Sequence, residues 1–352
     1  MDTKIIKIDS NNIDKALMKE AGDLIAKGQL VAFPTETVYG LGGDALDPEA
    51  SKKIYAAKGR PSDNPLIVHI GYAKDMEKVA KEVPEAAKKL ADAFWPGPLT
   101  IILDKSEAVP METTGGMDTV AIRMPNHPIA LSLIRESGCF IAAPSANTSG
   151  RPSPTEAGHV AEDLSGKIAM IVDGGEVGIG IESTIIDLTE EIPMVLRPGY
   201  ITPEMLSEVL GQEVIIDPGI IAADDITKPK APGMKYKHYA PKAQMTIVDG
   251  PEEMVIEKIN ELTKAEKEAG RKVAIIATEE TKDSYDADVI LCMGRRSNED
   301  EIAHQLYRIL RECDELAVDR IYSESFSTPR IGQAIMNRML KAAGHSVIQV
   351  AP

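Results

Sequence analysis

Short apolar segments alternate with amphipathic ones along the first two thirds of the chain. Brief apolar runs bounded by Gly, Pro or polar clusters are typical of buried strands, and several of the segments between them follow a helical period. The alternation predicts an α/β protein. The predicted strands of this part are "QLVAF" (29–33), "PLIVHI" (65–70), "LTIIL" (99–103), "VAIRM" (120–124), "CFIAA" (139–143), "IAMIV" (168–172), "STIIDL" (183–188) and "MVLR" (194–197).

One predicted helix carries clear signals at both ends. In "DPEASKKIYAAK", Asp47 can cap the N-terminus and Pro48 stands at the first helical position. Gly59 then fits the C-terminal stop, with Pro61 just beyond it. The pattern predicts a helix from Pro48 to about Lys58.

The pattern changes at residues 217–244, which carry four prolines and no periodicity. The chain therefore divides into a first domain (1–215), a basic, proline-rich linker or lid (216–243) and a smaller domain (244–352). The smaller domain is predicted to be a Rossmann-like parallel α/β unit, and it has no GxGxxG after its first strand, so no dinucleotide is assigned to it. Its predicted strands are 245–250, 272–277, 288–293, 320–325 and 346–350, and its predicted helices are 252–269, 299–313 and 331–343.

Composition narrows the functional classes. A formal net charge of −16 and only 4% aromatic residues argue against a broad phosphate-backbone surface or an aromatic platform for single-stranded nucleic acid. The 3 cysteines include no CxxC pair, and the 6 histidines have no metal-ligand spacing, so no metal site is assigned. The N-terminus lacks the apolar core of a signal peptide, and no run of about 18 apolar residues is present. We expect a cytoplasmic protein.

Small polar residues and arginines recur beside Gly or Pro near the strands of the first domain. Loops at strand ends commonly carry ligand-binding side chains, and glycines let backbone N–H groups approach an anion. Any one such stretch is most often an ordinary turn, but the recurrence favours a pocket for a polyanion. The residues concerned are Thr35, Thr37 and Tyr39 before Gly40, Gly42 and Gly43; Thr119 and Arg123; Ser145, Asn147 and Ser153; Ser183; and Arg197.

Two cations, Lys58 and Arg60, flank Gly59 at the predicted helix end. Lys58 could simply complement the helix dipole, with Arg60 solvated in the following loop. Alternatively the two could clamp a phosphate, since Arg offers a fork of donors and Lys a point charge. The residues alone leave both interpretations open. His69, inside an apolar run, is by itself more typical of a hydrogen-bonded core residue than of a ligand.

The linker has an unusual charge bias. Between Ile226 and Lys242 it holds five lysines and His238 but no acidic residue, although the whole chain is acidic. A plain spacer would not need this bias. A basic, proline-stiffened strap could lie over a polyanion site as a lid.

Four segments then occur in the order typical of one family: "PTETVYGLG", "KGRPSDNPL", "PSANTSG" and "PGMKYKHYAP". On these motifs the chain resembles the threonylcarbamoyl-AMP synthases in their two-domain YrdC-type form, over essentially its whole length. The resemblance implies a twisted open-sheet YrdC-type domain followed by the Rossmann-like one. It also implies nucleotidyl transfer, in which L-threonine, bicarbonate and ATP give threonylcarbamoyl-AMP and pyrophosphate.

The same resemblance implies partners and site residues. Mg²⁺ would arrive with ATP, and a separate complex would transfer the product to tRNA, forming N6-threonylcarbamoyladenosine next to the anticodon. Direct tRNA binding and membrane association are not expected. The implied core set is Lys58, Arg60, Ser145 and Asn147. The implied threonine site is Thr37, His69, Arg123, the backbone at Ala143, and Ser183. The implied ATP site is Arg60, Asn64, Thr119, Ser145, Ser153 and Arg197, with Tyr236 or His238 from the linker.

Three other functions compete with this one. A non-catalytic module could bind RNA through a basic concavity, with strong salt dependence and no response to threonine. A related carbamoyl transferase could contain a domain of this type, although further catalytic domains and zinc-finger cysteines are not found in this sequence. A nucleotide-binding regulator is the third alternative. No P-loop or GxSxG motif is present.

Overall fold

The structure is a computed structural model that describes residues 2–221, 231, 238–326 and 330–351. These fall into two compact units. The first comprises Met1–Ser149 and Ser153–Lys235, and the second comprises Gly150–Pro152 and Tyr236–Pro352. Most of the predicted linker (216–243) lies outside the described residues, so the domain limits given above stay predictions. Among the described residues, no helix is both long and apolar enough to cross a membrane.

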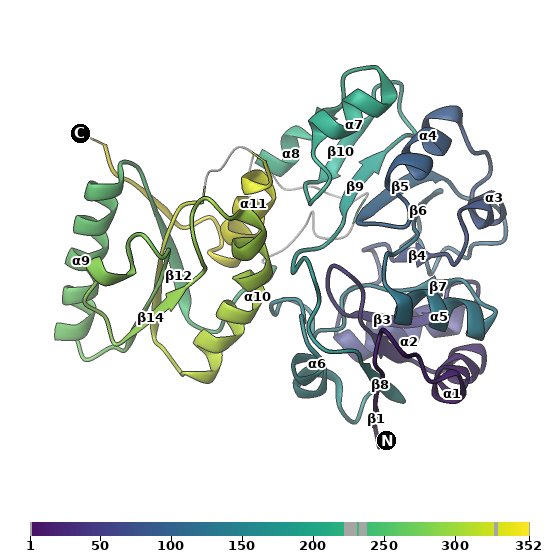
Figure 1. Ribbon diagram of the computed structural model, residues 1–352, viewed down its shortest axis with the longest axis horizontal. Coiled ribbons are helices and arrows are strands. Elements are labelled where there is room, and N and C mark those ends of the chain that lie inside the picture. Colours follow the sequence, from purple (N-terminus) through teal and green to yellow (C-terminus); the bar gives the residue numbers. More distant parts are fainter. Residues whose placement is uncertain (1, 222–230, 232–237, 327–329, 352) are drawn as a thin grey trace. The chain divides into compact units, whose positions relative to one another are not determined.

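The first unit is built on one mixed sheet of eleven strands, in the order β1-β8-β2-β3-β7-β4-β6-β5-β9-β10-β11 (Figure 1). All eight strands predicted for this part of the chain are present. The strands are β1 (Lys4–Lys7), β2 (Val31–Phe33), β3 (Gly40–Asp44), β4 (Ile67–His69), β5 (Leu99–Asp104), β6 (Thr119–Arg123), β7 (Ile141–Ala142), β8 (Met170–Asp173), β9 (Thr184–Asp187), β10 (Met194–Arg197) and β11 (Ile215–Ile216).

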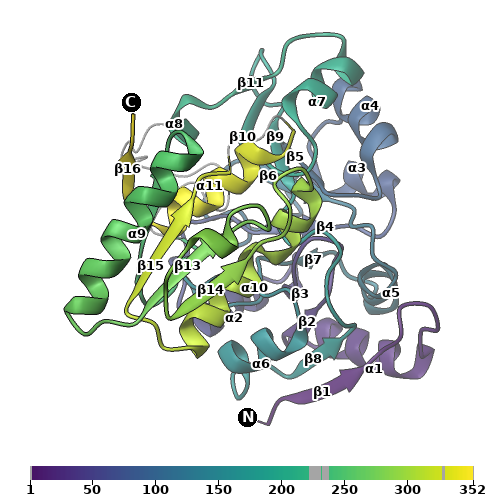
Figure 2. The ribbon, with the colours of Figure 1, turned by 60° about the vertical axis from the view of Figure 1, so that its left-hand side comes forward.

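Helices cover the two faces of this sheet unequally. α1 and α5 lie side by side and share one apolar cluster with β2 and β8 (Figures 1 and 2). The helices α2, α3, α4, α6 and α7 pack into a larger cluster with the opposite face. The helices of this unit are α1 (Lys15–Ala26), α2 (Pro48–Lys58), η1 (Ala73–Asp75), α3 (Met76–Val79), α4 (Glu85–Phe94), α5 (Pro128–Ser137), α6 (Ala157–Leu164), α7 (Pro203–Leu210) and α8 (Pro218–Ile221).

Strand register divides the central strands between the two faces. One row of paired residues belongs to the larger core: Val68, Ile122, Ile101, Ile186 and Val195. Because successive side chains in a strand point to opposite faces, the residues next to this row face the other side of the sheet. Part of that second face is apolar, and Ala231 is buried in the cluster there with Ile67 and Ile185.

Helix α2 forms as its end signals predict. The Asp47 carboxylate accepts the Glu49 N–H at 2.9 Å, Pro48 opens the helix, and Gly59 ends it in the left-handed region at φ 61°. The Arg60 N–H bonds to the Tyr55 carbonyl at 3.0 Å, and the Arg60 guanidinium lies 6.0 Å from the Tyr55 ring centre. Arg60 thus makes the closing contact that an apolar side chain often makes after such a glycine.

Residues 40–44 form a strand that the sequence analysis did not predict; it noted their glycines only among the stretches that favour an anion pocket. Gly40, Gly42 and Gly43 lie in β3, which pairs antiparallel with β2 and β7. A Cβ on Gly42 would stand 2.8 Å from Ile141 Cγ2 and 2.9 Å from the Phe33 ring. Close packing against neighbouring strands therefore explains the glycine at that position.

The second unit is a five-stranded sheet whose pairs are all parallel, in the order β14-β13-β15-β12-β16. This confirms the predicted Rossmann-like build. Figure 2 shows α9 in front of the strands, and Val255 and Ile259 of α9 pack on β12, β13 and β15. The elements are β12 (Gln244–Asp249), α9 (Glu252–Glu268), β13 (Val273–Ala277), η2 (Lys282–Ser284), β14 (Val289–Cys292), α10 (Glu299–Glu315), β15 (Arg320–Glu324), α11 (Gly332–Ala342) and β16 (Val347–Gln349).

Candidate active site

A row of mostly polar side chains crosses five neighbouring strands of the first unit at one end of the sheet. β4, β6 and β10 end there, while β5 and β9 run the other way and begin there. Ladder partners point to the same face, which here is the one opposite the larger core. Ser183 stands directly before β9. The paired row is His69, Arg123, Thr100, Ile185 and Arg197.

Besides the buried Arg197 at its far end, the row contains two charged or titratable residues, Arg123 and His69. Both are buried, with exposed fractions of 4% and 3%. Burial, reinforced by the nearby Arg123 charge, lowers the pKa of His69 to about 3, while its Nδ1 contacts the Ile67 carbonyl at 3.1 Å. His69 is therefore neutral at physiological pH. This end of the row offers one buried positive charge and one neutral imidazole.

Hydrogen bonds continue the row beyond Arg123. The Thr100 and Ser183 hydroxyls lie 2.8 Å apart. Arg197 donates from Nε to the Ser183 carbonyl at 3.0 Å and from Nη2 to the Ser183 hydroxyl at 3.1 Å. Ser183 thus joins the predicted threonine residues to Arg197, which was predicted to bind ATP.

A compact turn between β2 and β3 of the first unit carries Glu36 and Thr37. Thr35 Oγ1 accepts the Thr37 N–H at 3.1 Å and donates to the Val38 carbonyl at 2.7 Å, and the two threonine hydroxyls lie 2.9 Å apart. Glu36, which the sequence analysis did not select, lies with its Oε1 2.7 Å from Arg123 Nη2. Tyr39 serves the fold, because its hydroxyl donates to the Gly175 carbonyl at 2.7 Å.

The end of α2 approaches a second group of predicted residues. Arg60 Nη2 donates to the carbonyls of Asn64 and Pro65 at 3.2 and 3.1 Å. Asn64 is 2% exposed, and its Oδ1 has no hydrogen bond within the part of the chain that the structure describes. A buried amide oxygen that lacks a hydrogen bond is a candidate acceptor for a hydrogen-bond donor on a ligand.

Lys58 holds the loop that follows β7. Its ammonium is buried and donates to the Ser145 and Asn147 carbonyls, the latter at 2.7 Å, and to Asn147 Oδ1 at 3.3 Å. Ser145 Oγ donates to the same Asn147 Oδ1 at 2.6 Å. Lys58, Ser145 and Asn147 therefore form one network, in which Lys58 positions the loop. Ala143 precedes this loop, and its N–H already bonds to the Ile67 carbonyl at 2.9 Å.

The remaining predicted nucleotide residues are dispersed. Ser153 is buried and donates to Glu182 Oε1 at 2.6 Å. Thr119 begins β6, paired with Asp104, and so stands four residues before Arg123, or about 13 Å along the strand. The structure does not bring Thr119 to the row. Its assignment to ATP stays a prediction.

Of the two linker residues predicted to contact ATP, Tyr236 and His238, the structure describes only His238. Tyr236 lies outside the described residues. His238 belongs to the second unit, where its ring lies 4.8 Å from Tyr239, which in turn lies 5.1 Å from Tyr307 of α10. Which of the two completes the nucleotide site stays an open prediction.

Three residues of the site were not selected from the sequence: Glu36, Thr100 and Glu182. The signal for Glu36 was its place inside "PTETVYGLG", as the single acid in that segment. Thr100 and Glu182 carry little signal in the local sequence. Thr100 meets Ser183 only because their strands pair, and Glu182 meets Ser153 only because the folded chain brings the two segments together. In the described part of the chain, no group of three or more His, Cys, Asp or Glu could hold a metal ion.

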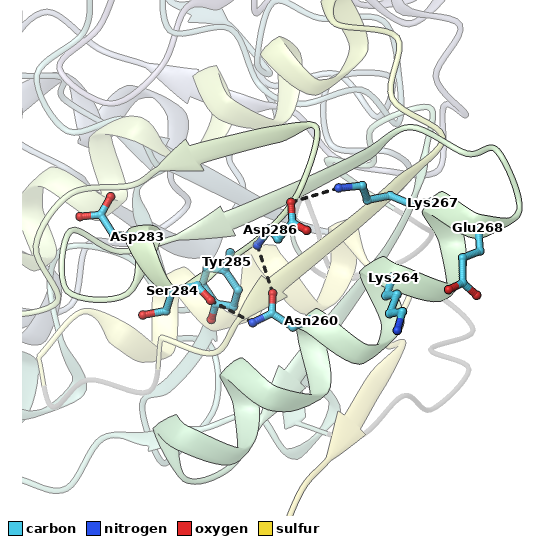
Figure 3. Close-up of a pocket in the computed structure, with 8 residues that line it drawn as sticks. All are labelled: Asn260, Lys264, Lys267, Glu268, Asp283, Ser284, Tyr285 and Asp286. Carbon is cyan, nitrogen blue, oxygen red and sulfur yellow. Dashed lines mark hydrogen bonds and ion pairs between the residues drawn. The ribbon is translucent and has the colours of Figure 1, made fainter.

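The second unit has cavities of its own. The larger, of about 720 Å³, lies between α9 and residues 283–286 (Figure 3). Its polar groups bond to one another: Asn260 Nδ2 donates to the Ser284 carbonyl at 2.9 Å, and Lys267 Nζ lies 3.1 Å from Asp286 Oδ1. These contacts fasten the segment to α9, which gives the lining a structural role.

A smaller cavity, of about 180 Å³, lies where β12 and β15 end. Glu324 is buried there and accepts hydrogen bonds from Thr281, from Arg296 and, at 2.7 Å, from the Tyr285 hydroxyl. Burial, together with the Glu324 charge, raises the pKa of Tyr285. The Glu324 carboxylate thus finds its hydrogen-bond partners within the second unit. None of the residues that line this cavity belongs to the polar row of the first unit.

The mixed sheet with a polar row across its strand ends, followed by a parallel α/β unit, defines a two-domain protein of the YrdC class. Two family models match the chain: "Telomere recombination" (Sua5, YciO and YrdC) over residues 23–199, and "Threonylcarbamoyl-AMP synthase, C-terminal domain" over residues 201–344. The chain belongs to the threonylcarbamoyl-AMP synthase family. Its relatives of that name include those of Pyrococcus abyssi, 52% identical over 96% of this chain and 97% of the relative, and Bacillus subtilis, 51% identical over 94% of each chain.

Solved structures agree with this assignment. P. abyssi Sua5 complexed with L-threonine superimposes with a TM-score of 0.94, is 51% identical, and covers 99% of this chain and 100% of its own. Escherichia coli YciO, 24% identical with a TM-score of 0.51, covers 55% of this chain and 95% of its own, and shares the fold. Family membership identifies the chain as an enzyme of the nucleotidyltransferase type.

Proposed function

We propose that the protein makes L-threonylcarbamoyladenylate and pyrophosphate from L-threonine, bicarbonate and ATP. The observation that carries the proposal is the buried Arg123 guanidinium beside a neutral His69 at the shared end of five strands. A buried guanidinium binds a carboxylate through charge-assisted hydrogen bonds. The threonine complex of P. abyssi Sua5 supports threonine as the amino acid.

The threonine site of this proposal uses Arg123 for the carboxylate. His69, Thr37, Ser183 and the backbone at Ala143 would surround the rest of the molecule. Ser183 and Thr37 are fully buried, and their hydroxyls already bond to Thr100, Arg197 and Thr35. In this proposal the substrate hydroxyl would therefore join an ordered polar network whose geometry is set before it binds.

The nucleotide site would be formed by two groups of residues. Arg60 and Asn64, beyond the end of α2, would hold phosphate and nucleotide polar atoms, and Ser145 and Asn147 would orient phosphate or carbamate oxygens. Thr119, Ser153, Arg197 and the linker residues Tyr236 or His238 complete the predicted set. ATP would enter as its Mg²⁺ complex, with the ion held mainly by phosphates and water.

The chemistry requires positioning and charge stabilisation. The threonine ammonium gives up one proton to solvent, and the neutral amine then combines with bicarbonate to give a carbamate and water. A carbamate oxygen then attacks the α-phosphate, and pyrophosphate leaves. No covalent enzyme intermediate is needed, so the residues would act by alignment and by stabilising negative charge. Arg60 would stabilise the triphosphate, while Lys58 keeps the Ser145–Asn147 loop in place.

The biological role that we propose is to supply the activated threonylcarbamoyl group for N6-threonylcarbamoyladenosine in tRNA. A separate transfer complex would act on the tRNA, next to the anticodon. The formal net charge of −16 suits a protein that hands on a small molecule and does not itself grip a phosphate backbone.

The decisive experiment incubates the protein with MgATP, labelled bicarbonate and one amino acid at a time, and analyses the products by mass spectrometry. A labelled acyl-adenylate formed with threonine, together with equimolar pyrophosphate, is the expected result. Product with several amino acids would contradict threonine specificity. Absence of any adenylate would contradict the proposed reaction, and salt-dependent RNA binding would then favour the RNA-binding alternative.

A further inference from the structure

The Glu36–Arg123 pair is an ion pair with incomplete hydrogen bonding. Glu36 Oε1 lies 2.7 Å from Arg123 Nη2, and the two side chains are 13% and 5% exposed. Yet neither Glu36 oxygen, and neither Nε nor Nη2 of Arg123, has an aligned hydrogen bond within the described residues. Buried charges in this state are costly. Such a pair is suited to a ligand that supplies the missing donors and acceptors.

The backbone around Glu36 is held firmly. The Glu36 carbonyl accepts the Ile179 N–H at 2.8 Å, and the Thr37 carbonyl accepts the Gly180 N–H at 3.0 Å. The Thr35 hydroxyl closes the turn across Thr37. The Glu36 carboxylate therefore extends from a backbone that hydrogen bonds hold in place. A side chain held in this way is suited to bind a ligand in one defined geometry.

The charges around the pair determine what it can accept. Arg123 is positive, His69 is neutral, and burial lowers the pKa of His127, the other titratable neighbour of Glu36. A simple carboxylate placed on Arg123 would also face the Glu36 carboxylate. An α-amino acid avoids this repulsion, because its ammonium stands one carbon from its carboxylate and can pair with Glu36 while the carboxylate pairs with Arg123.

We propose that Glu36 determines the specificity of the site for an α-amino acid, by pairing with the substrate ammonium group beside Arg123. The inference rests on the proposed function for the identity of the amino acid. It goes beyond it in assigning Glu36, which would also fix the direction of the amine before the amine is carbamoylated. Glu36 and Arg123 together are then a receptor for a zwitterion.

Calorimetric binding without ATP or bicarbonate tests this assignment. The probes are L-threonine, (R)-3-hydroxybutyrate, which lacks the ammonium, and L-threoninol, which lacks the carboxylate. In Glu36→Gln, we expect threonine and threoninol to bind at least about tenfold more weakly, because a charge-assisted hydrogen bond is lost. Hydroxybutyrate should bind as tightly as before or more tightly. Equal weakening of threonine and hydroxybutyrate would show that Glu36 only holds Arg123, and would overturn the proposal.

Two further variants serve as controls for the Glu36→Gln measurement. Glu36→Asp keeps the charge, so it should retain the preference for threonine over hydroxybutyrate within about threefold of the original protein; loss of that preference would overturn the proposal. Glu49→Gln changes an exposed carboxylate on α2 that pairs with Lys52, and serves as the matched control with no expected change. Thermal melts establish that each variant is folded.

The binding test of Glu36 and the test of the proposed reaction can fail independently of each other. Pyrophosphate release by the unaltered protein, with threonine, bicarbonate and ATP, tests the reaction itself. A protein that binds threonine with the expected Glu36 dependence but makes no adenylate contradicts the reaction and leaves the Glu36 assignment standing. A protein that makes the adenylate, while Glu36→Gln keeps the full preference for threonine over hydroxybutyrate, contradicts the Glu36 assignment alone.

Discussion

Arg60 completes a helix end, and it is also one of the residues proposed to bind ATP. Its guanidinium lies over the Tyr55 ring across the glycine that ends α2, and its Nη2 donates to the Asn64 and Pro65 carbonyls. The contact that completes the helix end does not exclude the proposed contact with phosphate. Arg60 as a whole is half-buried, so its side chain can be removed without opening the core.

Arg60→Ala is expected to lower threonine- and bicarbonate-dependent pyrophosphate release by at least about 100-fold, the typical cost of losing one preorganised donor to a developing charge. The free energy of unfolding should fall by only about 1 kcal/mol. Coupled pyrophosphate assays and chemical denaturation measure the two effects. Turnover near that of the unaltered protein would remove Arg60 from the mechanism.

His69 makes a prediction about pH. Its folded-state pKa of about 3 lies below the unfolded value of about 6.5. The unfolded chain therefore binds a proton first as the pH falls, and stability is lost between pH 6.5 and 3 and is unaffected above that range. At pH 5 the loss amounts to about 2 kcal/mol. Denaturation of His69→Gln should lack this portion of the pH dependence; an identical pH profile would contradict a neutral, buried His69.

At the residue scale, sequence and structure differ most clearly at Glu36 and Thr100. Arg123, Arg197 and Ser183 were selected from the sequence because they stand near Gly or Pro at predicted strands, whereas His69 was selected only through the family resemblance. Thr100 lies inside the apolar run 99–103, and only the pairing of β5 with β6 places it opposite Arg123. A long-range partner of this kind leaves no mark in local sequence.

At the scale of elements, α2 links the fold to the site. Its last residue, Lys58, is 3% exposed, and its ammonium binds the loop that carries Ser145 and Asn147. The helix was predictable in detail because its cap, its first-turn proline and its terminal glycine are local signals. β3 was not, because three glycines within five residues ordinarily indicate a turn and only strand packing explains them here.

Lys58→Met should leave buried carbonyl groups of the loop unsatisfied, lowering the free energy of unfolding by on the order of 3 kcal/mol. ATP affinity should fall by about tenfold, while threonine binding changes by less than about threefold, since the row of Arg123 is built from other strands. Denaturation and separate titrations of the two ligands measure this. Lys52→Met, exposed on the same helix, is the matched control. Equal losses for both ligands would contradict a role confined to the loop.

At the scale of the whole molecule, the second unit holds a short piece of chain from between Asn147 and Ser153. Arg311 of α10 is 1% exposed and donates from Nη2 to the Pro152 carbonyl at 2.7 Å, and the Ala240 N–H bonds to the Gly150 carbonyl at 2.9 Å. Gly150–Pro152 is therefore anchored within the second unit. The next residue along the chain is Ser153, predicted to bind ATP.

Removal of residues 226–242 together with the second domain should accordingly lower turnover by at least about tenfold, or lower retention of the product. The reason is that small displacements of positioning groups cost large factors in rate, and that the acid-free strap is lost as well. Steady-state assays and product titration, on a truncated chain shown by circular dichroism to be folded, measure the effect. An unchanged rate with unchanged product affinity would reduce the linker to a tether.

The sequence by itself determined most of the elements, the α/β class and the motifs, because apolar period, caps and turn residues act within a few positions of one another. The tertiary structure alone decided which side chains meet. His69, Arg123, Thr100 and Arg197 come from four strands far apart in the chain, and their common row depends on the register of parallel and antiparallel pairs. The same pairing brings Arg123 to the end of the sheet where the turn of Glu36 lies, which is why the carboxylate beside the arginine emerged only from the folded protein.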